Sequence, residues 1–140
     1  MAAAGVRVLG LLPEAVRRRA LRAAFDRARD AFNRGDLEAV FALFAADVEY
    51  GPPPPLHDGG PLHGRGKVLA FWRDIQDRYE RSSIENLSLL ESAPGRFVRR
   101  ARLRHHSRPG GEDLEYVIEQ TTELLRGRVV RQVNVLADGE

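Results

Sequence analysis

The sequence predicts an α+β domain in which three amphipathic helices cover one face of an antiparallel β-sheet. In the first half of the chain, apolar residues recur at three- and four-residue spacing, whereas the second half contains long segments of strand-like alternation. Turn sequences separate these segments, and opposite charges meet when the segments are paired. The 140 residues fit one domain, which we expect to span 13–138 after a flexible segment at 1–12.

The three helices have recognisable boundaries. The first is expected over 13–32, because its proline fits a first helical turn and its apolar stripe continues to the end. Gly35 can adopt the left-handed conformation that ends this helix, and Asp36 can cap a second helix over 36–45 through its side-chain oxygen. A third helix is expected over about 67–81.

Strand-like segments follow the second and third helices. A short strand is expected over 47–51, and the prolines at 52–55 then exclude a continued ladder, so 52–66 is expected to be a structured loop or edge segment. The remaining strands are expected over 84–90, 96–106, 114–125 and 128–136.

Charges predict the register of the long strands. Pairing about the turns SRPGGE and LRG brings arginines opposite glutamates, and a slip by one residue would break these pairs and reverse the faces. The expected pairs are Arg104 with Glu115, Arg100 with Glu119, and Glu123 with Arg131.

This register gives the sheet one charged face and one apolar face, and the helices should cover the apolar one. The apolar residues expected on this inner face are Phe97, Ala101, Leu103, Leu114, Tyr116, Ile118, Leu124, Val130 and Leu136.

Polar residues share the inner face. Arg99, Gln120 and Asn134 form one row across three strands, and Thr122 and Gln132 form the next. A buried polar group without a partner costs about 1–3 kcal/mol. Two interpretations remain open: a network in which these groups bond to one another, or a polar-lined pocket for a small molecule.

Histidines provide candidate proton carriers. His105 is expected at the far end of the inner face, although a histidine at a strand end is more commonly just half exposed. His57 and His63 flank a glycine-rich loop that could close the mouth of a cavity, although the pattern favours plain loop residues slightly. No set of histidines and carboxylates has convincing metal-ligand spacing.

Aromatic surface beside the pocket is expected from Tyr50, Trp72 and Tyr116.

Composition excludes several classes of protein. The chain has no cysteine, which removes thiolate metal sites, cysteine nucleophiles and disulfides. Its 22 basic and 20 acidic residues nearly balance, which argues against a nucleic-acid partner. No stretch is long enough to span a membrane, and the first residues differ from a secretory signal, so we expect a cytoplasmic protein. Nothing in the sequence requires a cofactor.

Three stretches, AFNRGDLEAVFALFAADVEY, LHGRGKVLAFW and TTELLRGRVVRQVNVL, resemble the SnoaL-like branch of the nuclear transport factor 2-like superfamily over about residues 20–137. The resemblance implies a conical α+β barrel, or cystatin-like roll, with a cavity between the concave sheet face and the helices. It also implies a homodimer formed through the convex sheet face. The superfamily includes ketosteroid isomerases, polyketide cyclases, dehydratases, epoxide hydrolases and non-catalytic binding proteins.

The resemblance also implies catalytic positions, from which this sequence departs. Ketosteroid isomerases place their three catalytic groups at positions that here hold Ala28, Gly51 or Pro52, and Thr122. Cyclases and epoxide hydrolases use an aspartate where this chain has Asn134, which cannot act as a general base at neutral pH. Arg99 resembles the epoxide-hydrolase arginine, but Ala101 stands where its acidic companion is expected.

We therefore expect a cofactor-independent, SnoaL-like enzyme acting on an apolar, carbonyl- or hydroxyl-bearing compound by isomerisation, cyclisation, hydration, dehydration or epoxide hydrolysis. Asn134, Gln132 and Gln120 would orient the polar group of the substrate. Arg99 would support an anion, and His105 or His63 would move a proton. Further substrate contacts are expected from Thr122, Tyr50, Trp72 and Tyr116. The alternatives are a non-catalytic ligand-binding or accessory dimeric domain and, if side chains fill the cavity, a protein-interaction module.

Overall fold

The computed structural model describes residues 13–137, so the predicted flexible segment at 1–12 lies outside the described residues. The helices are α2 (Glu14–Asn33), α3 (Leu37–Val40) and α4 (Arg65–Arg78). The strands are β1 (Phe44–Gly51), β2 (Leu62–His63), β3 (Tyr79–Ala93), β4 (Arg96–Ser107), β5 (Leu114–Leu125) and β6 (Arg128–Leu136). Among residues 13–137, no helix has the length and apolar character needed to cross a lipid bilayer.

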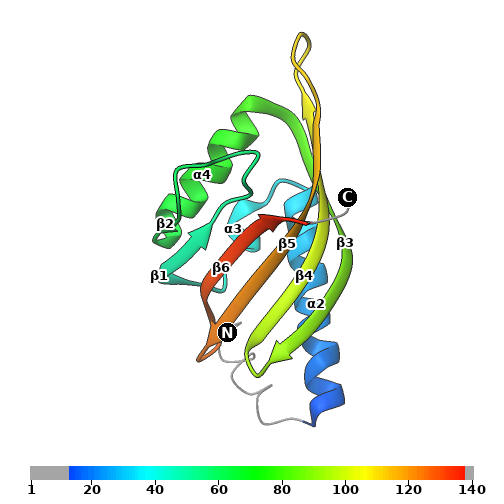
Figure 1. Cartoon of the computed structure of the whole chain (residues 1–140), viewed down its shortest axis with the longest axis vertical. Helices are drawn as coiled ribbons and strands as arrows, with labels where there is room; N and C mark the ends of the chain where they lie inside the picture. The colour runs from blue at the N-terminus through cyan, green and yellow to red at the C-terminus, as the bar shows by residue number, and fades with distance from the viewer. Residues whose placement is uncertain (1–12, 138–140) are drawn as a thin grey trace.

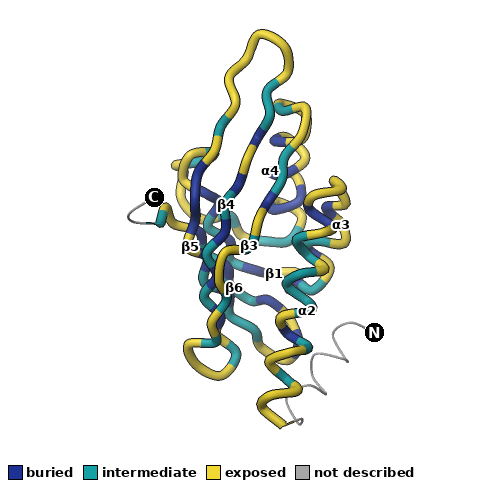
Figure 2. The backbone as a smooth tube through the Cα atoms, turned by 90° about the vertical axis from the view of Figure 1, so that its right-hand side faces the viewer, coloured by how far each residue is buried: buried dark blue, intermediate teal, exposed yellow. Residues whose placement is uncertain are grey.

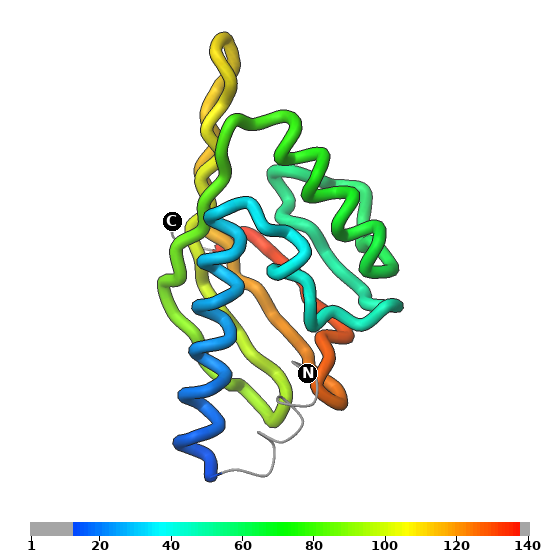
Figure 3. Tube along the Cα trace, turned by 180° about the vertical axis from the view of Figure 1, so that it is seen from behind, coloured from blue at the N-terminus to red at the C-terminus, as the bar shows by residue number. Residues whose placement is uncertain are grey.

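The strands form one curved, unclosed sheet in the order β2-β1-β6-β5-β4-β3, and the helices lie on one face of it (Figures 1 and 3). Helix α2 packs against β3, and α4 packs against β1, β2 and β3. The predicted α+β class is confirmed. The sheet is mixed rather than purely antiparallel, because β1 pairs in parallel with β6. The sequence indicated only hairpin-linked pairs, and no hairpin connects β1 to β6.

The structure confirms the predicted register and sidedness. Every second residue of β4 from 97 to 105 is buried, and Figure 2 shows the exposed tip of the β4–β5 hairpin projecting beyond the core. Helix-facing side chains therefore alternate with outward ones, as a half-covered sheet requires. The three predicted cross-strand pairs are Arg104 with Glu115, Arg100 with Glu119, and Glu123 with Arg131.

At one end of the inner face, a β-bulge buries a different residue from the one predicted. The register shifts between Glu123 and Leu124, so that Leu124 pairs with Val129. Val129 is therefore buried, at 7% exposure, and Val130, which strict alternation placed inside, is only half-buried. An extra residue in one strand reverses the alternation beyond it. The backbone N–H of Val129 also donates to the carbonyl of Leu43, which ties β6 to the start of β1.

Two helix boundaries differ from the prediction. Helix α3 is short because the chain after Val40 turns, with Phe44 N–H donating to the Phe41 carbonyl, and enters β1 at Phe44. Asp36 caps α3 as expected, accepting a hydrogen bond from Ala39 N–H at 3.2 Å. Helix α4 ends at Arg78 because the next residues pair with the far end of β4, which makes β3 longer than predicted.

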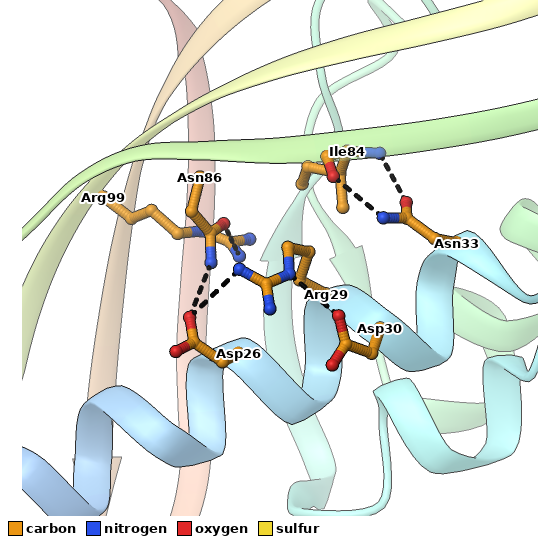
Figure 4. Close-up of polar contacts among 7 residues, drawn as sticks. All are labelled: Asp26, Arg29, Asp30, Asn33, Ile84, Asn86 and Arg99. Atoms are coloured by element: carbon orange, nitrogen blue, oxygen red, sulfur yellow. Dashed lines mark hydrogen bonds and ion pairs between the residues drawn. The ribbon is translucent and has the colours of Figure 1, made fainter.

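Asn33, at the end of α2, fastens the helix to the edge strand β3 (Figure 4). Its Nδ2 donates to the carbonyl of Ile84 at 3.1 Å, and its Oδ1 accepts from the N–H of Ile84 at 2.7 Å. The amide thus pairs with β3 as a neighbouring strand would, and it satisfies backbone groups at a sheet edge.

We expect Asn33→Ala to lower the free energy of unfolding by about 1–3 kcal/mol, because two backbone groups of Ile84 lose their partner. Urea unfolding measures this change. Asn33→Asp keeps the acceptor and removes the donor, so its loss should be smaller. An Asn33→Ala protein as stable as the wild type would show that the two hydrogen bonds between Asn33 and Ile84 do not stabilise the fold.

Candidate functional site

The first predicted polar row forms on the inner face. Arg99 pairs with Gln120, and Gln120 pairs with Asn134. Gln120 Nε2 donates to Asn134 Oδ1 at 3.0 Å, while Asn134 Nδ2 donates to the carbonyl of Gly51 at 2.9 Å. All three side chains are at most 7% exposed. The row therefore lies in the interior, between the sheet and the helices.

The neighbouring row is a bonded pair. Gln132 Nε2 donates to Thr122 Oγ1 at 2.9 Å, and Tyr50 on β1 lies opposite Gln132. Tyr50 accepts a hydrogen bond from Trp72 Nε1 at 3.0 Å. Burial raises the pKa of Tyr50 to about 12, against opposing effects of Trp72, Arg99 and Asn134. The structure therefore brings Tyr50 and Trp72 together with the amide residues, and the phenol is neutral at ordinary pH.

Two atoms in the first row have no hydrogen-bond partner. They are Nε of Arg99 and Oε1 of Gln120, the only buried side-chain polar atoms without one among residues 13–137. One is a donor and the other an acceptor, and their residues lie opposite each other on adjacent strands. Unpaired buried groups are rare in folded proteins because desolvating them is costly. This donor and acceptor mark the candidate binding site.

The guanidinium of Arg99 contacts no carboxylate of the described residues. Its Nη1 donates to Asn86 Oδ1 at 3.0 Å, and Asn86 Nδ2 donates to Asp26 Oδ1 at 3.4 Å (Figure 4). Asp26 and Asp30 instead pair with Arg29. Burial lowers the pKa of Arg99 to about 10, with Tyr50 opposing the shift. The interior therefore holds a positive charge whose nearest bonded partner is neutral.

His105 is fully buried, so the expectation of a half-exposed strand-end histidine is wrong. Its ring lies among Trp72, Tyr79 and Tyr116, because β4 extends along the start of β3 and under α4. Nδ1 lies 2.7 Å from Ser82 Oγ, and Nε2 lies 2.8 Å from the hydroxyl of Tyr116. Burial lowers the pKa of His105 to about 4, and it also raises the pKa of Tyr116 well above its ordinary value. The imidazole is neutral at pH 7, with both nitrogens engaged.

The structure does not bring His63 to the site. His63 pairs with Glu49, and Glu49 forms an ion pair with Arg131 on the outer face, so His63 lies on the side opposite Asn134. Its side chain is exposed. The structure therefore places the predicted proton carrier His63 outside this interior site.

His57 also lies away from the polar row. It contacts the Gly60 carbonyl at 3.1 Å and the ring of Phe71, which packs the loop against α4.

A hollow of about 260 Å³ lies at the end of α2, away from the first polar row. Its apolar wall includes Trp72 and Tyr79. Ser82 also lines the hollow, and the hydroxyl of Ser82 bonds to His105. Trp72 also donates to Tyr50, which lies opposite Gln132, so this side chain joins the wall of the hollow to the second polar row. Arg99, Gln120 and Asn134 do not line it.

The chemistry available at the row is hydrogen bonding and charge stabilisation. Arg99 can stabilise a negative charge, Tyr50 can donate a proton, and Gln120 and Asn134 can orient a carbonyl or hydroxyl. Among residues 13–137, no cluster of three histidine or carboxylate side chains could hold a metal ion. Asp26 is the carboxylate that the Asn86 hydrogen bond joins to Arg99.

The curved sheet, the helices on its concave face and the inward polar residues define a nuclear transport factor 2-like α+β cone. A model of the SnoaL-like domain family matches residues 25–132, and the chain belongs to that family. A search of curated proteins gave no match.

Solved structures confirm the fold. A nuclear transport factor 2-like protein of unknown function from Burkholderia pseudomallei has 24% identity and a TM-score of 0.69, over 83% of this chain and 89% of its own. A proposed polyketide cyclase from Xanthomonas campestris has 19% identity and a TM-score of 0.69 over the same shares. An epoxide hydrolase from Mycobacterium tuberculosis has 13% identity and a TM-score of 0.66, over 82% of this chain and 76% of its own.

Sequence reasoning missed three residues that support the site. Asn86 holds Arg99, Asp26 holds Asn86, and Ser82 binds His105. Asn86 and Ser82 belong to β3, whose register shifts between residues 86 and 88, and no turn motif fixed its pairing with β4. The charge pairing of Arg102 with Glu85 was the one signal that could have positioned this strand.

Proposed function

We propose that this protein is a small-molecule enzyme of the SnoaL-like type that binds the polar group of an otherwise apolar compound at the first inner row. The observation that carries the proposal is the unpaired donor and acceptor on Arg99 and Gln120. Sites that recognise small molecules combine apolar walls with a few convergent polar groups, and this interior has that composition.

The proposed roles follow from the contacts. Arg99 stabilises negative charge on a carbonyl oxygen or an anionic group, and burial strengthens that interaction. Gln120 and Asn134 orient the substrate, and the neutral phenol of Tyr50 donates a hydrogen bond or a proton. Gln132, Thr122 and Trp72 hold these groups in place. Isomerisation, aldol-type cyclisation, hydration and dehydration beside a carbonyl group, and epoxide opening develop negative charge on oxygen, which Arg99 would stabilise.

Asn134→Leu is expected to weaken binding at least tenfold and to abolish turnover, because it removes the contacts to Gln120 and Gly51. A panel of cyclic ketones, epoxides and polyketide-like acids would be screened by thermal shift and then assayed for turnover. Ser88→Leu is the control, since Ser88 pairs with Arg100 on the outer face. Equal binding and turnover in the wild type and Asn134→Leu would refute the proposed site.

A ligand-binding or accessory domain without catalysis is the second candidate. The observation that favours it is that the row offers no carboxylate in contact with Arg99, and that the low pKa of His105 makes this histidine a weak base. Compounds that bind to the wild type without turnover, and that lose binding in Asn134→Leu, would support this candidate over the enzyme.

We also propose that two copies associate through the convex sheet face. Register places an outer row of Leu90, Val98, Thr121 and Val133 across four strands, between rows of charged residues. Such a row suits a self-complementary interface. Val98→Glu should convert a dimer into a monomer in light scattering, whereas Val16→Glu, on an exposed position of α2, should not. A monomeric wild type at micromolar concentration would contradict this proposal.

A further inference from the structure

Arg99 and Gln120 present a charge and an acceptor side by side in the interior. The Nε–H of Arg99 and Oε1 of Gln120 lack partners, and their side chains are 7% and 4% exposed. Residues directly opposite each other on antiparallel strands have Cβ atoms about 5 Å apart. The two unpaired atoms therefore belong to neighbouring side chains, which one small ligand fragment could contact together.

The two atoms require different partners. Nε–H is a donor and needs an acceptor, whereas Oε1 is an acceptor and needs a donor. A ketone or an ether oxygen could satisfy only Arg99. A ligand that satisfies both must present an acceptor and a hydroxyl or amide proton within one short fragment.

The buried positive charge of Arg99 further restricts the chemical class of the ligand. Arg99 is bonded to the neutral Asn86, and the carboxylates of Asp26 and Asp30 pair with Arg29 on α2 (Figure 4). Tyr50, the ionisable group that favours the charged form of Arg99, is itself neutral. A buried cation is strongly stabilised by an anionic partner at hydrogen-bond distance. The acceptor that fits Arg99 best is therefore a carboxylate or an acidic enolate.

We propose that the ligand is an organic acid with a hydroxyl group on a neighbouring carbon, attached to an apolar body. Its carboxylate or enolate oxygen accepts from Arg99 Nε–H, and its hydroxyl donates to Gln120 Oε1. This inference rests on the proposed function, because it names the class of compound that the same row selects.

The probes are mandelate, phenylacetate and mandelamide, titrated calorimetrically against the full chain. Mandelate carries both groups, phenylacetate lacks the hydroxyl, and mandelamide lacks the charge. We expect mandelate to bind at least tenfold more tightly than phenylacetate and mandelamide. Equal affinity for all three, or tightest binding of mandelamide, would overturn the assignment.

Gln120→Glu provides an internal test, because it places a carboxylate of the protein itself opposite Arg99. The variant should melt at a higher temperature than the wild type and lose mandelate binding at least a hundredfold. The matched control is Val16→Glu, which places the same carboxylate on an exposed position of α2, away from the convex sheet face, and should change neither property. Gln120→Leu should retain phenylacetate binding and lose the advantage of mandelate. Unchanged mandelate affinity in Gln120→Glu would refute the inference.

Failure of this inference can be told apart from failure of the proposed function. If neutral ketones bind and lose affinity in Asn134→Leu while mandelate and phenylacetate do not bind, the row binds small molecules but not hydroxy acids. If a high-resolution crystal structure shows one ordered water joining Arg99 Nε to Gln120 Oε1, and no probe or panel compound binds, both proposals are overturned.

Discussion

Arg99→Met is expected to make the protein more stable while it abolishes ligand binding. The lowering of the Arg99 pKa from its ordinary value of 12.5 to about 10 reflects a desolvation cost on the order of 3 kcal/mol. Methionine fills similar space without a charge, and the lost hydrogen bond to Asn86 costs only about 1 kcal/mol. We therefore expect the free energy of unfolding to rise by about 1–2 kcal/mol in urea titrations at pH 7.

Arg100→Met is the matched control, because Arg100 is the next residue on β4 and faces outward opposite Glu119. Removing this half-exposed cation should lower stability slightly and leave ligand binding intact. A residue that costs stability and is required for binding has the signature of a functional site. A strong loss of stability in Arg99→Met would instead identify Arg99 as a structural residue of the core.

His105→Gln is expected to remove a large part of the pH dependence of stability. Burial lowers the pKa of His105 from 6.5 to about 4, so the unfolded chain binds a proton that the folded protein does not between these pH values. The contribution of neutral His105 is complete above pH 6.5 and is lost as the pH falls toward 4. The wild type should lose up to about 3 kcal/mol relative to His105→Gln over this interval.

Urea unfolding of both proteins from pH 7 to pH 4 measures the difference, and acidic groups common to the two proteins cancel. Glutamine can still bond to Ser82 and Tyr116, which are the partners of His105. His106→Gln is the control, since His106 lies on the outer face and is half exposed. Parallel stability curves for the wild type and His105→Gln would show that His105 is not held neutral by burial.

The sequence predicted the sheet well because charges and turns constrain it strongly. The pair of Arg104 with Glu115 and the pair of Glu123 with Arg131 fixed the faces of three strands, and this put Gln120 and Asn134 inside. The partner of β1 was not predictable, because a parallel pair with β6 leaves no hairpin in the sequence. The bulge that buries Val129 was likewise hidden, since both valines fit either face.

The sequence predicted which residues form the polar row, but it did not predict the hydrogen bonds that hold them. Polar alternation along β4, β5 and β6 placed Arg99, Gln120 and Asn134 in one row. It could not show that Asn86 bonds to Arg99, because that contact depends on the irregular pairing of β3. His63 was misplaced because its face depends on a two-residue strand, β2, within a proline- and glycine-rich loop. Local pattern determines faces, whereas contacts between distant elements require the assembled fold.

The most direct test of the account is a co-crystal structure of the protein with the tightest-binding compound among the panel and the three probes. We predict that the polar group of the compound lies within hydrogen-bond distance of Arg99 Nε and Gln120 Oε1, with its apolar body toward Tyr50 and Trp72. A compound bound elsewhere, for example in the hollow beside Gln76 and Arg34, with the Arg99 row unchanged, would contradict it.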